Sequence, residues 1–341
     1  MSLELILAGI ILISLTFYVL LGGADYGAGV WSLFATGPRA LAQREAVAKA
    51  IGPIWEANHV WLILVVTVLF TAFPKAFALL STRLHIPLSL MLIGIVLRGS
   101  AFAFRTHDVV PRSEREAGAQ KVWERVFAVS SVFTPIMLGT TIGAAASGRL
   151  GGQADTFVDM FVRPWANPFC LAVGLLALTL FAFLASVYLL LETRDDGLRE
   201  DFRKRALWGG AVAALMAGAV FLLSKNGAPY VQYNLAYTTW GRLTVALVGL
   251  SALAGFVSLW QRRYRSAFVS TIGEVTFILW GWALAQYPYL VIPGATIMDA
   301  APTPTLELVL ATLLIGALVL FPSLYYLYRV FKGSIILRAL E

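Results

Sequence analysis

Asp25 and Glu56 are two acidic residues inside the first two long apolar stretches of this sequence, where a charge is costly. Asp25 falls within an apolar run over residues 4–33, and Glu56 falls within the next run, over residues 54–73. An acidic side chain near the middle of a bilayer costs about 2.5 to 3.5 kcal/mol on insertion scales, so such residues usually serve a proton, ion or substrate path. The two acids are therefore the first candidates for chemistry.

The segment around Asp25 reads LGGADYGAGV and contains four glycines. Glycines let neighbouring helices approach closely, and a carboxylate among them would reach an adjacent helix. The alternative is a helix-packing seam in which the acid is incidental. The cost of burying an acid favours the functional interpretation.

The segment around Glu56 reads PIWEANHVWLI and concentrates polar and aromatic side chains in about two helical turns. They are Trp55, Glu56, Asn58, His59 and Trp61. Helical spacing puts Glu56 and His59 on one face, where a carboxylate and an imidazole would pass protons inward. Asn58 and Trp61 line a neighbouring strip. Tryptophan is common at membrane interfaces, and a lone histidine is often structural. A purely structural role therefore stays open for the tryptophans and for His59.

Arg98 is the single basic residue placed in the interior of a predicted span, in LIGIVLRGSAFAFR, since Arg242 lies at the very start of its run. An arginine near two carboxylates in a low dielectric lets at least one of them ionise while the other keeps a proton. Asp25, Glu56 and Arg98 would then form a proton-loading site. The alternative is that Arg98 is only a structural counter-ion for the buried acids.

The composition defines the class of protein. The chain has 341 residues, of which 59% are hydrophobic and 13% charged, whereas a soluble domain carries about 25% charge. The excess of basic residues lies between apolar runs rather than in one stripe, so we expect no nucleic-acid partner. The single Cys170 excludes an internal disulfide.

Nine apolar runs are long enough to cross the roughly 30 Å of a bilayer core as helices. They cover residues 4–33, 54–73, 86–104, 126–147, 168–191, 206–224, 241–260, 267–286 and 306–328. We therefore predict an all-α polytopic membrane protein with nine transmembrane helices. The segment 286–304 contains four prolines and should be an ordered, non-helical outer loop.

The positive charges predict the orientation. Of the 26 lysines and arginines, 19 lie in segments 34–53, 105–125, 192–205, 261–265 and 329–341, which share one side of a nine-span topology. Positive charge accumulates on the cytoplasmic side, so the N-terminus should be outside and the C-terminus cytoplasmic. Asp25, Glu56 and Arg98 then share the cytoplasmic half of three consecutive helices.

The histidines limit the metal chemistry available to this chain. Haem in a membrane bundle usually needs His, Met or Cys ligands that face one cavity. The sequence has only His59, His85 and His107, of which His59 alone is clearly within a span. We expect no metal site on this chain, so a partner would carry any redox centre.

These motifs resemble subunit II of the cytochrome bd-type quinol oxidases, including the cyanide-insensitive branch. The matching segments are GGADYGAG, GPIWEANHVWLI, TAFPKAFALL, LRGSAFAFR, AQYPYLVIP and LYYLYRVFKG, and they extend from the first predicted span to the last. The second motif departs from the W-D-G-N of many members, because here it reads Trp55-Glu56-Ala57-Asn58. Glutamate keeps the proton-bearing group one methylene further out.

The resemblance implies a fold and a site. It implies a first four-helix bundle over 1–148, a second over 165–286 and a peripheral ninth helix over 305–330, within one membrane domain. In that family, acids of subunit II belong to a cytoplasmic proton pathway. Carried over by motif, these acids are Asp25 and Glu56, to which we add His59, with Trp55, Asn58, Trp61 and Arg98 as supporting residues.

The resemblance also implies partners. A subunit I would carry haems, b and d-type or b only, oxidise quinol and reduce oxygen to water, while this subunit binds no haem of its own. A small single-helix accessory subunit, membrane lipid and quinone are further expected neighbours, in a bacterial inner membrane. Two alternatives stay open: a stand-alone proton-coupled transporter, because buried acids among small residues also mark transporter sites, and a scaffold whose acids are structural.

Overall fold

The computed structural model describes residues 2–51, 55–107, 114–152 and 155–340. Almost every element in these ranges is a helix, and the one sheet is a short two-stranded hairpin. The prediction of an all-α membrane protein is confirmed. Within the described residues, eight helices are long and apolar enough to cross a membrane, or nine if one bent pair counts as a single span.

The first span is a rod in three parts. It consists of α1 (Leu3–Phe17), a π-helical turn (Tyr18–Gly22) and α2 (Gly23–Leu33), and together they make one apolar segment of 31 residues. π-turns inside α-helices are rare and often mark functional sites. This one directly precedes the turn that carries Asp25.

The second span is bent. Helix α4 (Trp55–Ala72) follows the short α3 (Ala40–Ile51) and is followed by α5 (Pro74–Arg83), which turns by 116° from α4. The break falls before Pro74, the first residue of α5, because proline lacks the N–H that would continue the preceding helix. The predicted span over 54–73 therefore ends at this break.

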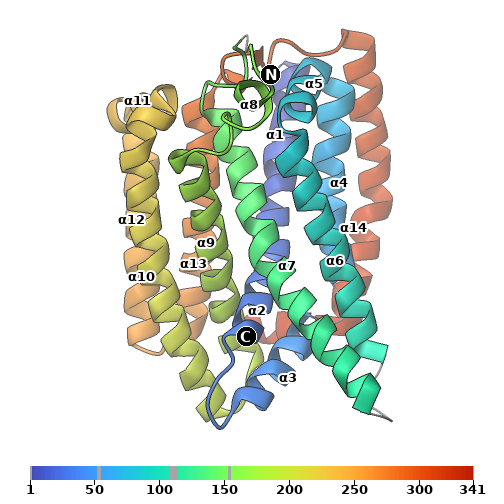
Figure 1. Cartoon of the computed structure of the whole chain (residues 1–341), viewed down its shortest axis with the longest axis vertical. Coiled ribbons are helices and arrows are strands. Elements are labelled where there is room, and N and C mark those ends of the chain that lie inside the picture. The colour runs from blue at the N-terminus through green and yellow to red at the C-terminus, as the bar shows by residue number, and fades with distance from the viewer. Residues whose placement is uncertain (1, 52–54, 108–113, 153–154, 341) are drawn as a thin grey trace.

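The remaining elements follow in order along the chain (Figure 1). They are α6 (His85–His107), α7 (Glu114–Ala146), α8 (Phe157–Phe161), α9 (Pro168–Glu192), α10 (Asp196–Gly227), α11 (Pro229–Tyr237), α12 (Thr239–Trp260), α13 (Tyr264–Gln286), strands β1 (Tyr289–Val291) and β2 (Ala295–Thr296), and α14 (Thr303–Leu340).

Helix α9 is the most buried of the long helices and α14 the least. Two thirds of the membrane-crossing stretch of α9 is buried inside the protein, whereas none of that of α14 is. Helix α9 packs against α2, α7 and α10, and α14 lies against α1 and α4. The division into two bundles and a peripheral helix stays a prediction.

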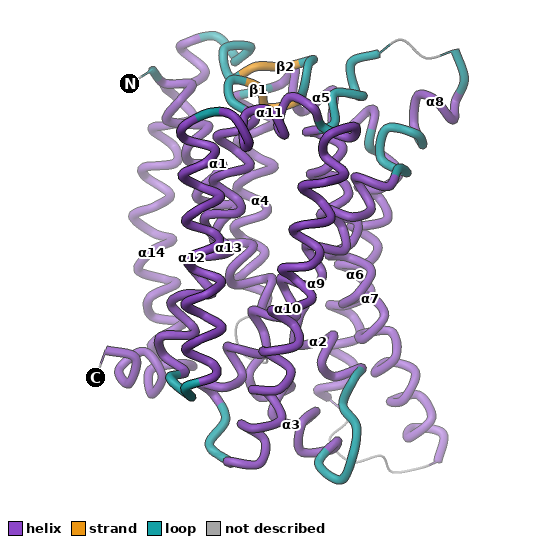
Figure 2. The backbone as a smooth tube through the Cα atoms, turned by 90° about the vertical axis from the view of Figure 1, so that its left-hand side faces the viewer, coloured by secondary structure: helices purple, strands orange, loops and turns teal. Residues whose placement is uncertain are grey.

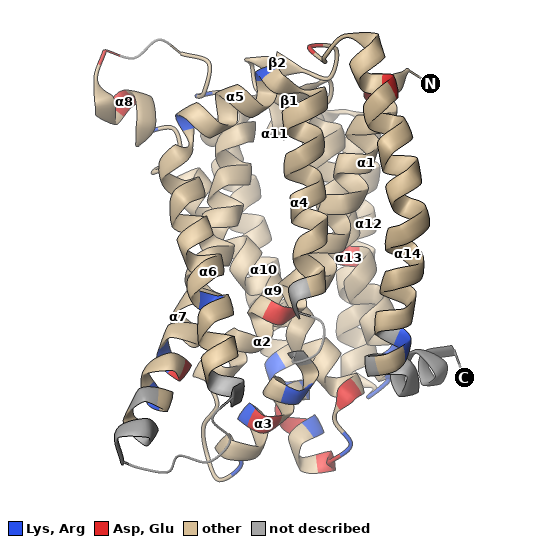
Figure 3. Cartoon of the chain, turned by 90° about the vertical axis from the view of Figure 1, so that its right-hand side faces the viewer, with Lys and Arg blue, Asp and Glu red and all other residues tan. Residues whose placement is uncertain are grey.

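The two ends of the helix array differ in character. The short helices α5, α8 and α11 and the hairpin lie at one end, and α3 lies at the other (Figures 1 and 2). The charged residues gather mainly at the α3 end, with few along the middle of the long helices (Figure 3). This separation is the pattern expected of a membrane protein with one strongly charged face.

The predicted outer loop is ordered and non-helical, as expected. Strand β1 pairs antiparallel with β2, and Gln286 at the end of α13 donates a hydrogen bond from Nε2 to the Leu290 carbonyl (2.7 Å). The Ile292 amide donates to the Ala145 carbonyl of α7 (3.1 Å). The hairpin thus ties the end of α13 to α7.

Asp299 anchors the segment after this hairpin. Its carboxylate accepts hydrogen bonds from Lys75 Nζ (2.8 Å), from the Thr296 amide (2.8 Å) and from the Thr296 hydroxyl (2.9 Å). These donors favour the charged carboxylate and lower the pKa of Asp299 from an ordinary 3.8 to about 2, with the Lys75 hydrogen bond the largest cause.

We expect this anchor to weaken in acid. Because the folded-state pKa of Asp299 lies below its ordinary value, its stabilising contribution is complete above about pH 4 and is lost as the pH falls toward 2. The protection of the Thr296 amide against hydrogen exchange should fall across this window. In Asp299→Asn, the protection should be low at neutral pH and change little with acid, while the exposed Asp155→Asn control behaves like the parent. Equal protection in the parent at pH 5 and pH 2 would contradict this assignment.

Candidate proton-handling cluster

Asp25 of α2 and Asn58 of α4 meet directly, although they lie on different predicted spans. The Asn58 side-chain amide donates a hydrogen bond from Nδ2 to Asp25 Oδ2 (2.5 Å). Asn58 is buried, with 4% of its surface exposed. A hydrogen bond donated to a carboxylate favours its charged form, so the second motif contributes a donor to the acid of the first.

Arg98 of α6 lies beside the same helix. It is 3% exposed, and its Nε donates to the Ser131 hydroxyl of α7 (3.2 Å). The guanidinium carbon lies 4.5 Å from the ring centroid of Tyr26 and 5.2 Å from that of Phe127, so two aromatic faces stabilise the buried cation. Its Nη2 is buried and has no hydrogen-bond partner among the described residues. The cation therefore sits next to the residue that follows Asp25.

Two tyrosines extend the cluster toward His59. The hydroxyls of Tyr18 and Tyr26 lie 3.4 Å apart, and both side chains are almost fully buried. The ring of His59 lies 6.1 Å from that of Tyr18. Tyr18 of the π-turn thus lies beside the imidazole of α4, and Tyr26 of α2 lies beside the guanidinium of α6.

Asp25, Arg98 and Asn58 lie in the half of the array nearer α3. Asp25 is eight residues before the end of α2 and Arg98 nine residues before the end of α6, which is about 12 and 14 Å along each axis. Asn58 lies in the first turn of α4. Asp25 and Arg98 therefore lie at similar depth in the helix array, toward the α3 end. Their placement in the cytoplasmic half of a membrane stays a prediction.

Close helix packing fixes the position of α2. A Cβ atom at Gly27 would lie 1.9 Å from the Phe181 carbonyl oxygen of α9, and one at Gly29 would lie 2.1 Å from the Ser131 hydroxyl of α7. The glycines therefore do form a packing seam. Because Ser131 also accepts the hydrogen bond from Arg98, the seam and the polar cluster are one structure.

Of the two tryptophans in the second motif, only Trp61 has a described side chain. Trp61 is 6% exposed, stacks on Phe17 of α1 (4.6 Å between ring centroids) and approaches Phe321 of α14, so it packs between α1 and α14. The side chains of Trp55 and Glu56 lie outside the described residues. The role of Glu56 and its pairing with His59 stay predictions.

Several relevant residues were not predicted. Nothing in the sequence marks Tyr18, Tyr26 or Ser131 as a site residue, because residues with hydroxyl groups are ordinary in membrane helices. Glu274 of α13 is marked by the sequence, since it lies within the predicted span 267–286. It is 5% exposed and lines two cavities of about 280 and 520 Å³. The reasoning that singled out Asp25 also applies to this acid.

The described histidines do not form a haem ligand pair. His59 lies in the second turn of α4, near the α3 end, whereas His85 begins α6 at the opposite end, where its ring packs on Phe161. Among the described residues, no group of three or more His, Cys, Asp or Glu side chains is arranged to hold a metal ion.

The fold and cluster define a polytopic helical membrane protein with a partly buried carboxylate, a buried amide and a buried guanidinium toward the α3 end of the helix array. Comparison with known families gives a match over residues 3–331 to the model described as cytochrome bd terminal oxidase subunit II. The chain therefore belongs to the cytochrome bd terminal oxidase subunit II family.

Curated relatives agree with this assignment. The chain is 23% identical over 325 residues to a putative cytochrome bd menaquinol oxidase subunit II of Bacillus subtilis, covering 92% of this chain and 91% of the relative. It is 22% identical to the cytochrome bd-I ubiquinol oxidase subunit 2 of Escherichia coli, covering 87% and 83%. These relatives are parts of quinol oxidases, which are oxidoreductase complexes.

A solved structure shares the fold. A chain of the bd oxidase from Geobacillus thermodenitrificans superposes with a TM-score of 0.77 at 23% identity, covering 98% of this chain and 99% of that chain. At this identity the likeness supports the fold alone.

Proposed function

We propose that this chain is the haem-free subunit of a membrane quinol oxidase and that it supplies part of a proton path to its partner. The partner is a haem-bearing subunit I, which oxidises quinol and reduces oxygen to water. Oxygen reduction consumes protons, and Asp25 with Asn58, His59 and Arg98 would take them up from the cytoplasmic side. Glu56 is included as the second acid.

The observation that carries this proposal is the partly buried hydrogen bond between Asp25 and Asn58, beside the buried Arg98. A carboxylate that exchanges protons needs groups that stabilise its charged form without holding it permanently in one ion pair. An amide donor and a nearby guanidinium held between aromatic rings meet this need. The Tyr18 and Tyr26 hydroxyls supply further groups able to donate and accept protons.

The orientation follows from the charge distribution. We place the α3 end, which carries most of the charged residues, in the cytoplasm, so the N-terminus lies outside and the C-terminus inside. The protein would then be a multi-pass component of a bacterial inner membrane. Asp25 would be reached from the cytoplasm.

Purification with an affinity tag on this chain tests the proposal. The complex should contain a larger haem-bearing subunit and show haem absorption bands that respond to quinol and oxygen. The chain expressed without its partner should show no haem bands. A stable chain that purifies alone and carries out proton-coupled uptake in liposomes would instead support a transporter.

A further inference from the structure

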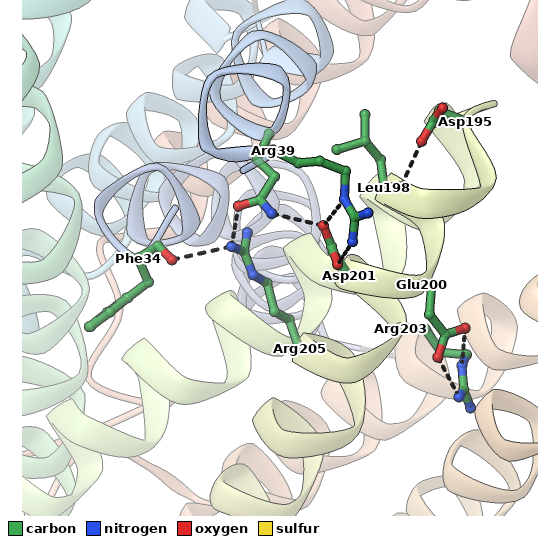
Figure 4. Close-up of polar contacts among 9 residues, drawn as sticks. Phe34, Arg39, Asp195, Leu198, Glu200, Asp201, Arg203 and Arg205 are labelled. Atoms are coloured by element: carbon green, nitrogen blue, oxygen red, sulfur yellow. Dashed lines mark hydrogen bonds and ion pairs between the residues drawn. The ribbon is translucent and has the colours of Figure 1, made fainter. Parts of the chain in front are cut away.

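A polar cluster at the α3 end joins the end of α2 to α10 (Figure 4). Arg39 donates from Nε (2.8 Å) and Nη2 (2.6 Å) to the carboxylate of Asp201. Gln43 of α3 donates to the same carboxylate (2.9 Å) and accepts from Arg205 Nη2 (2.5 Å). Two side chains of α10, Asp201 and Arg205, are thus bonded to the segment that follows α2.

Arg205 also holds the end of α2 itself. Its Nη2 donates to the main-chain carbonyl of Phe34, the C-terminal cap of α2 (3.2 Å). Helix ends leave such carbonyls without intrahelical partners. The same guanidinium lies 5.3 Å from the Trp31 ring and 5.6 Å from the Phe202 ring. One side chain therefore contacts both the backbone and the last turn of α2.

A second contact holds the same turn. The indole Nε1 of Trp31 donates to the Ala182 carbonyl of α9 (2.6 Å). Trp31 is six residues and Phe34 nine residues beyond Asp25 along the chain. No proline interrupts α2 between them, so a shift at the last turn moves Asp25 along with it. At its other end α2 continues from the π-turn, which is a less regular connection.

We propose that Arg205 is a positioning residue that sets the depth of α2 and so holds Asp25 against Asn58. The inference rests on the proposed proton role of Asp25. Arg205 lies outside the proton-handling cluster and acts on it through the helix. It belongs to α10, so the second half of the chain determines the geometry of an acid in the first half.

The test compares Arg205→Gln and Arg205→Lys with Arg203→Gln in the purified oxidase complex. Arg203 bonds to Glu200 and to the Leu259 carbonyl, so it is a matched control on the same helix. Oxygen consumption per haem is measured across pH. We expect about a tenfold loss and a displaced pH profile in Arg205→Gln, because a misplacement of about 1 Å is enough to cost up to a hundredfold. Arg205→Lys should recover part of the rate, and Arg203→Gln should match the parent.

A double substitution separates positioning from general damage. If Arg205 acts through Asp25, adding Arg205→Gln to Asp25→Asn should cause no further loss, because the two changes affect one function. Losses that multiply, or an unchanged pH profile with only less assembled complex, would overturn the positioning role. Normal turnover in Asp25→Asn alone would instead remove the proposed function.

A milder variant covers the case in which Arg205→Gln does not assemble. Gln43→Leu removes one acceptor of Arg205 and leaves its bond to Phe34. We expect a smaller displacement of the pH profile in the same direction. A parent-like profile in assembled Gln43→Leu and Arg205→Lys complexes would count against the proposal.

Discussion

Asp25→Asn is expected to lower oxygen consumption per assembled complex by about a hundredfold, the lower end of what a positioned proton-transfer group contributes. Asparagine has nearly the shape of aspartate and keeps an oxygen that accepts the hydrogen bond from Asn58. It does not take up and release a proton near neutral pH. The fold and the haem content should therefore be retained while turnover falls.

The control for this change is an acid of the same type outside the cluster. The Asp196 side chain is 99% exposed at the start of α10, so Asp196→Asn should consume oxygen at the parent rate. Turnover and the haem spectrum are measured on the same samples, which separates a slower reaction from poorer assembly. A parent-like rate in Asp25→Asn would remove Asp25 from the proton path.

The charged residues of the candidate site could be predicted from the sequence, because the free-energy cost of burying a charge applies to each residue on its own. Asp25 and Arg98 stand out in the sequence because a charge within an apolar run needs compensation, and the helix count places them at similar depth. Their partners depend on how the helices rotate and cross, which the sequence pattern does not specify. The contact between Arg98 and the Tyr26 ring, and the bond from Asn58 to Asp25, come from that packing.

The fold, too, could be predicted only in part from the sequence. Apolar length predicts the long helices well, because hydrocarbon thickness sets a minimum span. Local breaks are harder to predict: the π-turn at Tyr18–Gly22 interrupts a continuous apolar run without any proline. The bend at Pro74 has a clear proline signal, yet the orientation of α5 depends on its contacts with α6 and the hairpin.

Glu274 is an acid within an apolar run but outside the two motifs that contain Asp25 and Glu56. Its burial cost is as visible in the sequence as that of Asp25, but no glycine-rich or aromatic motif surrounds it. In the structure it lines a smaller cavity between α9, α10, α12 and α13 and a larger one that also reaches Phe181 of α9 and Val19 of the π-turn. Phe181 also stacks on Tyr26 (6.3 Å between ring centroids), so the larger cavity reaches the edge of the cluster around Asp25.

Gly27→Ala is expected to have the largest effect on stability. The added methyl group would lie 1.9 Å from the Phe181 carbonyl oxygen and 2.4 Å from its carbon. Both are backbone atoms and do not rotate away, so α2 and α9 must separate. Overpacking usually costs about 1 to 3 kcal/mol, and we expect the upper end of this range because two helices move.

Gly9→Ala is the matched control, since it lies on the same first span. No atom lies within 4 Å of a Cβ at that position, and alanine favours a helix over glycine by roughly 0.5–1 kcal/mol. The thermal midpoint of the purified complex should fall in Gly27→Ala and hold or rise in Gly9→Ala. Turnover should fall with the midpoint in Gly27→Ala, because separation of α2 from α9 also carries Asp25 away from Asn58. Equal midpoints in the two variants would show that the seam between α2 and α9 does not hold the acid in place.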